Sequence, residues 1–167
     1  VLFGDGAGAV VMGVGEEPVS HQTSRVYSTH LHADGRYAKE LWVSEPGNAN
    51  GPDRLSLARV AQGGHYPKMN GKTVFIHAVK RMPEVLLEGL EANHLSLSDV
   101  DLFVFHQANL LMLESVRKKL QIEAERVPYS LHHYGNTSSA SVPMTMVTQL
   151  RQQLIADKQK LLLSGFG

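Results

Sequence analysis

The chain has 167 residues, 43% hydrophobic and 19% charged, which is ordinary for one globular domain. Sixteen basic residues balance sixteen acidic ones, so the overall charge gives no reason to expect a nucleic-acid partner. The sequence contains no cysteine, which excludes disulfides, thiolate metal sites and a cysteine nucleophile within this chain. No apolar run approaches bilayer length and no signal-peptide pattern is present, so we expect a cytoplasmic protein.

Both ends of the chain lie in runs that are typical of buried strands. The chain starts with the apolar residues Val1-Leu2-Phe3 and ends with Leu161-Leu162-Leu163 followed by Ser-Gly-Phe-Gly. A natural chain rarely begins and ends within a strand. We therefore expect this chain to be a piece of a longer protein.

The first 35 residues indicate two strands. Residues 1–12 form an apolar run with glycines at 4, 6 and 8, a spacing that fits neither a P-loop nor a dinucleotide fingerprint. A bulged strand under close backbone contact explains these glycines better than a phosphate site does. Residues 26–32 alternate as a second strand. Its His30 and His32 have no evident third metal ligand, so a structural or hydrogen-bonding role is favoured over a metal site.

Residues 35–70 are predicted to be a long irregular connection, which contains Trp42 and several glycine and proline turns. Loops of this length act as lids or partner surfaces, or are simply mobile. From Gly71 to about Leu95, apolar residues at helical spacing predict a long amphipathic helix. Pro83 lies within this pattern and predicts a kink or a break.

The next segment places a histidine at the end of a strand. Residues 100–105 are a short apolar run that predicts a buried strand, and His106 follows directly. Apolar residues then recur at helical spacing from Leu110 to Leu120. His106 is therefore predicted at a strand-to-helix junction, where α/β folds place ligands and chemistry.

A similar arrangement follows with an asparagine. Residues 127–131 predict a strand, residues 132–136 a turn, and the residues after them a helix that has Pro143 in its first turn. The small residues 137–141 allow close backbone approach. Asn136 is therefore also predicted at a strand-to-helix junction, close to His106. A last apolar run at 160–164 predicts a final strand, and this alternation of strands and helices predicts an α/β fold.

Several motifs resemble one enzyme family in the same order. They are His106-Gln107-Ala108-Asn109, the Gly-Asn-Thr-Ser-Ser-Ala-Ser run at 135–141 and the closing Gly165-Phe166-Gly167. The segments 2–9, 28–35 and 69–75 add to the resemblance, which covers nearly the whole chain apart from residues 37–65. Together they resemble β-ketoacyl-acyl carrier protein synthase III, the initiating condensing enzyme of bacterial fatty acid synthesis.

The resemblance implies a thiolase-like layered α/β/α fold, represented mainly by its C-terminal half. Residues 1–35 would then be the last strands of the N-terminal half, and residues 36–69 a connecting loop region. Residues 70–167 would be the C-terminal half, truncated before its last strand. The family continues beyond this point with further glycines, one of which supplies a backbone N–H to the oxyanion hole. The full-length protein is expected to be a homodimer.

The resemblance also implies a reaction. The family condenses an acyl-CoA primer, expected here to be acetyl-CoA, with malonyl-acyl carrier protein through a Cys-His-Asn triad. By resemblance, His106 and Asn136 are the catalytic histidine and asparagine. The cysteine lies outside this chain, so the chain alone is expected to be inactive. Neither a cofactor nor a metal is expected, and neither nucleic acid nor a membrane is expected as a partner.

The chemistry explains these two residue types. Decarboxylation of a malonyl thioester leaves negative charge on the thioester oxygen, and a neutral imidazole N–H beside an amide N–H₂ supplies two donors for it. Neither group needs a charge, which avoids burying an unpaired ion.

Further site residues are implied by the same resemblance. The segment that meets acyl carrier protein corresponds to Gln107, Ala108, Asn109, Leu110 and Leu111. The better-known members have an arginine at the position of Leu111, which puts the strength or geometry of carrier or CoA recognition in doubt. The basic residues Arg117, Lys118 and Lys119 either suit an acidic carrier or form a solvated helix end. Phe75 and Ala78 resemble wall positions of the substrate and CoA tunnel, although both also fit a plain apolar helix face.

Three other readings stay open. One is a condensing relative of secondary metabolism or an ester-forming relative, because the pocket that measures acyl length lies largely outside this chain. Another is a non-catalytic carrier-binding subunit of the same fold. The third is an unrelated α/β binding module, which would require His106 and Asn136 to lie far apart.

Overall fold

The computed structural model describes residues 3–14, 24–46, 56–152, 155–156 and 158–167. By their contacts, these residues group into two compact units. The larger unit combines Val1–His30 with Ala78–Phe166, and the smaller one comprises Leu31–His77 with Gly167. The grouping divides the long helix α2 (Gly71–Ala92), whose first residues belong to the smaller unit.

The centre of the larger unit is a pair of parallel strands, β3 (Leu102–Phe105) and β4 (Leu161–Ser164). All of β3 is buried, and Phe103, Val104 and Phe105 are 0% exposed. A strand that is covered on both faces needs apolar side chains throughout, which is why the predicted run has no alternation. Both predicted strands are confirmed.

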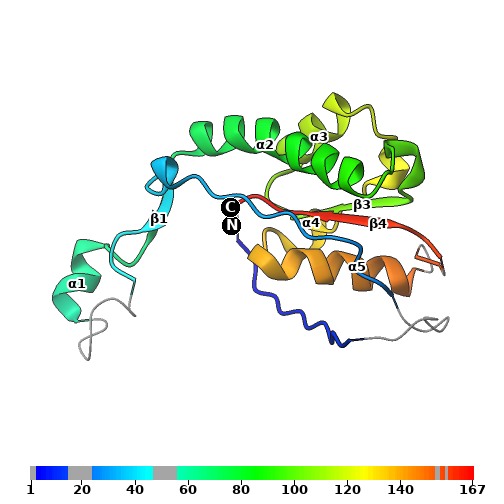
Figure 1. Cartoon of the computed structure of the whole chain (residues 1–167). Coiled ribbons are helices and arrows are strands. Elements are labelled where there is room, and N and C mark those ends of the chain that lie inside the picture. Colours follow the sequence, from blue (N-terminus) through cyan, green and yellow to red (C-terminus); the bar gives the residue numbers. More distant parts are fainter. Residues whose placement is uncertain (1–2, 15–23, 47–55, 153–154, 157) are drawn as a thin grey trace. The chain divides into compact units, whose positions relative to one another are not determined.

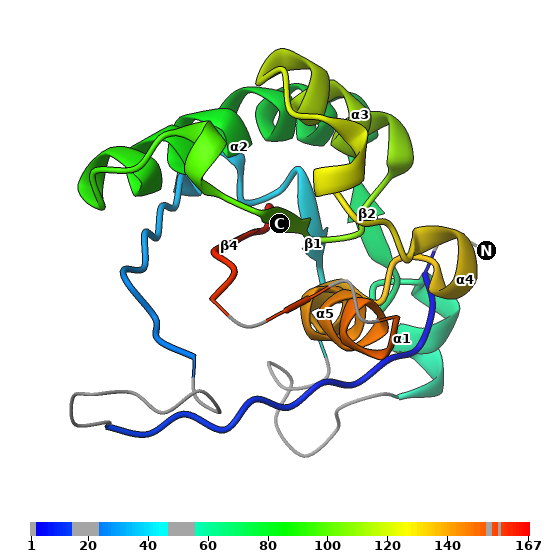
Figure 2. The same cartoon turned by 90° about the vertical axis from the view of Figure 1, so that its right-hand side faces the viewer.

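Helices cover both faces of this strand pair. In Figures 1 and 2, α3 (Leu110–Lys119) and the part of α2 from Ala78 onward lie over one face, and α5 (Ser141–Arg151) lies over the other. The result is a layered α/β arrangement, as predicted. Short elements connect these layers: η3 (Leu97–Asp99), η4 (Ala124–Arg126), α4 (Leu131–Tyr134) and η5 (Ser138–Ala140).

Of the kink or break that the sequence predicts at Pro83, the break is absent, because the long helix α2 is continuous through this residue. Pro83 is buried together with Ala78, Met82, Leu86 and Leu90, which form the apolar face of the helix. Burial of this face stabilises the helix in the core, although Pro83 has no backbone N–H and removes one helical hydrogen bond. Within the described residues, no helix is long and apolar enough to cross a membrane.

The two strands predicted in the first 35 residues are not formed in the part of the chain that the structure describes. Residues 5–14 and 24–29 are exposed, and the nearest approach to a ladder is an isolated parallel bridge between Phe3 and Asn136. An extended segment becomes a strand only when a neighbour takes its backbone groups. The predicted close backbone contact of the glycines is confirmed. A Cβ on Gly4 would meet the Tyr134 backbone, and a Cβ on Gly8 would meet the Pro143 ring.

Side chains rather than a ladder hold the second extended segment in the larger unit. His30 Nδ1 lies 2.9 Å from a Glu88 carboxylate oxygen, and its Nε2 lies 3.0 Å from the Ser28 hydroxyl. Asn93 also donates to Ser28 Oγ at 2.6 Å. His30 thus has a hydrogen-bonding role. No group of three possible metal ligands occurs among the described residues.

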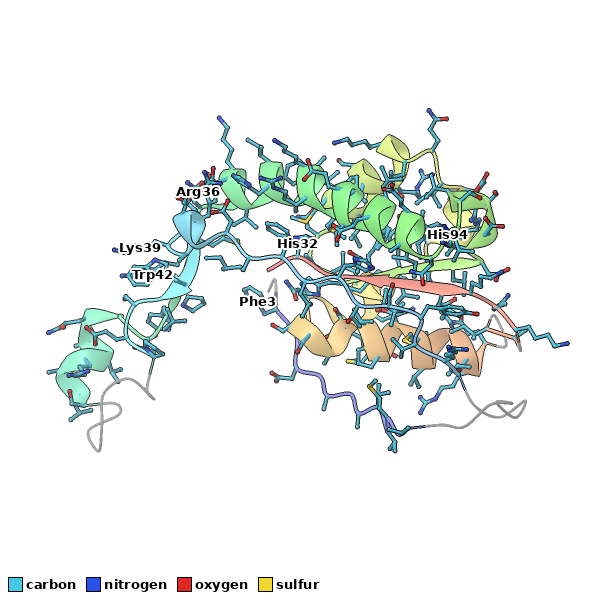
Figure 3. The ribbon with its side chains drawn as sticks, viewed as in Figure 1. Phe3, His32, Arg36, Lys39, Trp42 and His94 are labelled. Carbon is cyan, nitrogen blue, oxygen red and sulfur yellow. The ribbon has the colours of Figure 1, made fainter. Side chains whose placement is uncertain are left out.

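The smaller unit corrects the prediction of an irregular connection. It contains η1 (Gly35–Tyr37), β1 (Leu41–Val43), α1 (Leu57–Gln62) and β2 (Pro67–Met69), and the two strands pair antiparallel. Trp42 stands opposite Lys68, and the ammonium groups of Lys39 and Lys68 lie 5.7 and 5.6 Å from the centre of its ring. Figure 3 shows Lys39 beside Trp42. Strands of three residues are too short to give an alternating pattern.

Candidate active site

His106 lies directly after β3, as predicted. Its backbone N–H donates to the Ser164 carbonyl at 2.8 Å, so the main chain of His106 stays attached to β4. Its side chain turns toward the start of α5, where Nδ1 lies 2.7 Å from the Ser141 hydroxyl. Strand pairing therefore fixes the backbone of His106, and Ser141 fixes the orientation of its ring.

The Ser141 hydroxyl has a second partner. The backbone N–H of Gln107 donates to Ser141 Oγ at 3.0 Å, and Ser141 is 1% exposed. The same side chain thus joins the two residues that follow β3 to the first residue of α5. Sequence reasoning noticed the small residues 137–141 but gave Ser141 no role, because its contacts depend on residues more than thirty positions away.

The electrostatics of the site favour a neutral imidazole. Burial lowers the pKa of His106 below its usual value, because charge is costly away from water. A hydrogen bond to the Ser138 backbone acts in the opposite direction, less strongly. A neutral ring keeps one N–H donor and one nitrogen lone pair, which suits a hydrogen-bonding role.

Asn136 is 9% exposed and is held in a tight local turn. Its side-chain oxygen Oδ1 accepts from the Ser138 N–H at 2.9 Å, and its backbone carbonyl accepts from the Gly4 N–H at 2.9 Å. Because the oxygen is engaged, the amide N–H₂ points elsewhere and has no acceptor among the described residues. Asn136 therefore presents two preorganised donors.

Backbone strain accompanies this turn. Ser138 has φ of +54°, in the left-handed region that side chains disfavour, and Gly135 has φ of +67°. Such strain costs on the order of 1 kcal/mol and persists where surrounding contacts impose it. Here the hydrogen bond from the Ser138 N–H to Asn136 Oδ1 stabilises the strained conformation.

The predicted strand at 127–131 is wrong. After η4, residues 127–130 form no β-strand, and the short helix α4 begins at Leu131. Gln107 supplies the reason, because its side-chain oxygen accepts from the backbone N–H groups of Ser130 at 2.9 Å and Leu131 at 3.3 Å. These amides open α4, and a side-chain acceptor there favours a helix start. Asn136 therefore follows a helix and a glycine instead of a strand.

The two predicted catalytic residues meet one short segment. The ring of His106 contacts the Ser138 backbone and the Ser141 hydroxyl, while Asn136 Oδ1 binds the Ser138 N–H. Residues 138–141 thus connect both side chains. A cleft of about 180 Å³ between residues 7–9 and α5 includes neither His106 nor Asn136.

The residues predicted to meet a carrier protein have different surroundings. Gln107 is 0% exposed, so its side chain has no surface for a protein partner in this chain. Ala108 is half-buried, and Asn109 caps α3 by accepting from the Leu111 N–H at 2.9 Å. Leu110 is 49% exposed and Leu111 72% exposed. The start of α3 therefore presents an apolar surface.

The basic residues near the end of α3 also differ from one another. Arg117 and Glu114 form an ion pair at 2.8 Å, and Lys118 lies 3.9 Å from the same carboxylate with most of its side chain exposed. Lys119 Nζ donates to the backbone carbonyl of Val79 at 3.3 Å. Lys118 and Lys119 are thus both exposed, whereas Arg117 is half-buried.

The two predicted tunnel residues lie on α2. Phe75 is half-buried, and Ala78, one helical turn later, is 0% exposed. The Ala78 side chain therefore belongs to the core of the larger unit in this chain.

The chain is similar to known proteins along its whole length. Residues 90–167 match the family model for the C-terminal region of 3-oxoacyl-[acyl-carrier-protein] synthase III. The β-ketoacyl-[acyl-carrier-protein] synthase III of Alkalilimnicola ehrlichii is 42% identical over 167 residues, covering all of this chain and 48% of that protein. The chain spans about half the length of the curated relatives it matches.

Solved structures support the same relationship. The β-ketoacyl-[acyl carrier protein] synthase III of Thermus thermophilus is 36% identical with a TM-score of 0.68, over 81% of this chain and 40% of that one. A priming β-ketosynthase from the R1128 polyketide pathway is 29% identical with a TM-score of 0.67, over 80% of this chain and 39% of that one. The fold is thus the thiolase-like α/β fold of condensing enzymes. Within that class, the chain is similar to the C-terminal portion of β-ketoacyl-[acyl-carrier-protein] synthase III.

Proposed function

We propose that this chain supplies the histidine and asparagine of a condensing enzyme that starts fatty acid synthesis. The full-length enzyme would join an acyl-CoA primer, acetyl-CoA by preference, to malonyl-acyl carrier protein. The observation that carries the proposal is the attachment of His106 and Asn136 to one strained turn, where the Asn136 N–H₂ has no acceptor among the described residues. The similarity to β-ketoacyl-[acyl-carrier-protein] synthase III along the whole chain supports it.

The two side chains would act on the malonyl thioester. Loss of carbon dioxide breaks the carbon–carbon bond and leaves its electron pair as an enolate on the thioester. The Asn136 N–H₂ and a His106 ring N–H would donate to the enolate oxygen. A neutral histidine suits this role, because the low pKa of His106 keeps the donor uncharged in a buried site.

The condensation needs a nucleophile that this chain lacks. We propose a cysteine in the rest of the full-length protein, which first takes the acyl group from CoA as a thioester. The enolate carbon then attacks the acyl carbonyl carbon, and the cysteine sulfur leaves with its electron pair. The 167-residue chain alone is therefore expected to have no condensing activity.

The carrier protein would meet the beginning and the solvent-facing side of α3. Leu110 and Leu111 offer apolar contact, and Lys118 offers a positive charge to an acidic carrier. Leucine at position 111 replaces a bidentate donor with an apolar side chain, so contact there would depend less on salt. We also propose that the full-length enzyme is a homodimer.

The proposal is tested with His106→Ala and Asn136→Ala in the full-length protein. Malonyl decarboxylation should fall about 10²- to 10³-fold in each, because each loses one donor to the enolate oxygen. Acyl transfer from CoA to the cysteine, followed by mass spectrometry, should continue. His132→Ala is a matched control, since His132 is exposed on α4. Unchanged decarboxylation in both variants would refute the proposal.

A second candidate is a priming enzyme of secondary metabolism. The similarity to the R1128 priming β-ketosynthase, with 29% identity, favours keeping it. Turnover by the full-length protein with acetyl-CoA and with longer acyl-CoA primers separates the two. A preference for acetyl-CoA supports the first candidate, and rejection of acetyl-CoA in favour of a longer primer supports the second.

A further inference from the structure

The Ser141 hydroxyl is a buried group with a single proton and two partners. One partner is the Gln107 backbone N–H at 3.0 Å, and the other is His106 Nδ1 at 2.7 Å. Ser141 is the first residue of α5, and its own carbonyl accepts from the Thr145 hydroxyl at 2.7 Å. The position of Ser141 is therefore fixed from both its backbone and its side chain.

The proton on Ser141 can be assigned from these contacts. A backbone N–H is always a donor, so Gln107 occupies a lone pair of the Ser141 oxygen. The hydroxyl proton then needs an acceptor, and His106 Nδ1 is the one within hydrogen-bond distance among the described residues. A proton on Nδ1 would leave the buried hydroxyl proton without a partner, which is unfavourable. Nδ1 is therefore the acceptor.

We propose that Ser141 is a positioning residue that holds His106 in the tautomer protonated at Nε2. This proposal rests on the proposed function of His106 as a donor to the enolate oxygen. With Nδ1 accepting from Ser141, the ring N–H lies at Nε2, on the opposite side of the ring, where it can donate. Ser141 itself touches no reacting atom.

The Gln107 contact makes this arrangement rigid. Gln107 is 0% exposed, and its side chain also binds the Phe105 carbonyl at 2.9 Å and the Ser130 N–H at 2.9 Å. These side-chain contacts anchor Gln107, and with it the backbone N–H that orients Ser141, to the end of β3 and to the start of α4. The His106 tautomer is set by the framework of the fold rather than by a mobile side chain.

The direct test is nitrogen NMR of the full-length protein labelled with ¹⁵N-histidine. At a pH where His106 is neutral, Nδ1 should carry the signal of an unprotonated nitrogen and Nε2 that of a protonated one. In Ser141→Ala the two signals should move toward a mixture of tautomers. A protonated Nδ1 in the unsubstituted protein would overturn the proposal, whatever the activity.

A matched control separates positioning from general loss of stability. Ser130 is also buried, at 2% exposure, and its hydroxyl binds Thr145 at 2.7 Å rather than His106. Ser130→Ala should lower the melting temperature comparably while leaving the His106 signals in place. Equal changes of the His106 signals in Ser130→Ala and Ser141→Ala would contradict a specific role for Ser141.

Activity gives the second readout. Ser141→Ala should reduce kcat for malonyl decarboxylation about 10²-fold with little change in KM, because a misplaced donor acts mainly in the transition state. Ser141→Thr keeps a hydroxyl and should recover part of that loss. If His106→Ala leaves decarboxylation intact, the proposed function fails, whereas the tautomer measurement still decides the assignment of Ser141. A changed tautomer with unchanged kcat would refute the positioning role.

Discussion

The ammonium group of Lys119 lies 3.3 Å from the carbonyl oxygen of Val79, which is four residues before Pro83 on α2. In an uninterrupted helix that carbonyl would accept from the N–H of residue 83. Proline has no such N–H, so Lys119 on α3 replaces the lost donor. This contact, together with burial of the Pro83 ring, explains how α2 passes through a proline without ending.

The replacement predicts coupling between Lys119 and Pro83. Lys119→Met should lower the free energy of unfolding by about 1 kcal/mol, because it leaves the Val79 carbonyl without a side-chain donor. In a Pro83→Ala background the helix supplies that donor, so Lys119→Met should cost clearly less. Urea unfolding of the four proteins measures the coupling. Lys118→Met is the control, and equal costs of Lys119→Met in both backgrounds would contradict the explanation.

A second cluster joins α3 to the segment before α4. The Tyr129 hydroxyl donates to Glu114 at 2.6 Å, and Arg117 donates to both oxygens of the same carboxylate at 3.0 and 2.8 Å. The Arg117 and Tyr129 hydrogen bonds lower the pKa of Glu114 to about 2. Burial and the bond to Glu114 raise the pKa of Tyr129.

Tyr129→Phe should raise the pKa of Glu114 from about 2 toward its ordinary 4.5, because one of the donors that stabilise the carboxylate is removed. The free energy of unfolding should fall by about 1 kcal/mol. Carbon NMR titration of the Glu114 carboxyl measures the first effect. Tyr134→Phe is the matched control, since Tyr134 is 43% exposed. An unchanged Glu114 pKa in Tyr129→Phe would be inconsistent with the hydrogen bond.

Acid should weaken the native state through the same carboxylate. The pKa of Glu114 is lower in the folded chain than its ordinary 4.5, so the unfolded state binds the proton first. The stabilisation is fully present above about pH 4.5 and is lost as the pH falls toward 2. Unfolding midpoints in urea between these pH values should decline less steeply in Glu114→Gln. Parallel declines in both proteins would exclude this contribution.

His106 sets a separate pH dependence. Burial lowers the pKa of His106 below its ordinary 6.5. The ring therefore becomes protonated only at acid pH, where its protonation destabilises the folded state and disturbs the proposed donor geometry. Decarboxylation by the full-length protein should therefore stay constant through neutral pH and fall on the acid side, with an apparent pKa below 6.5. A rate profile with its acid limb above that value would contradict a buried neutral His106.

The sequence predicts best what depends on local pattern and burial. The sequence predicts β3, β4, α3 and α5, because each of them contains its own continuous apolar run or helical period. Residues 127–131 have the composition of a strand but enter a helix, since the Gln107 side chain binds amides 23 and 24 positions away. No local pattern contains that contact.

The candidate site divides in the same way. The position of His106 after a strand could be predicted, because a buried strand and its end are visible in the sequence. The turn that orients Asn136 could not, since it depends on a left-handed Ser138 and on the Gly4 N–H, which lies more than 130 residues earlier. Ser141 was missed for the same reason: its hydroxyl acts on a residue from another element.

Gly4 links the first segment of the chain to Asn136. A Cβ at this position would collide with the Tyr134 carbonyl, so Gly4→Ala should open the hydrogen bond from the Gly4 N–H to the Asn136 carbonyl, now 2.9 Å long. We expect faster hydrogen exchange at the amide of residue 4 and a shifted Asn136 side-chain NMR signal. In the full-length protein, decarboxylation should fall about 10-fold or more, because a displaced donor loses its alignment. Gly13→Ala is the matched control, since a Cβ on Gly13 meets nothing within 4 Å. Equal behaviour of the two alanine variants would show that Gly4 does not support the turn that holds Asn136.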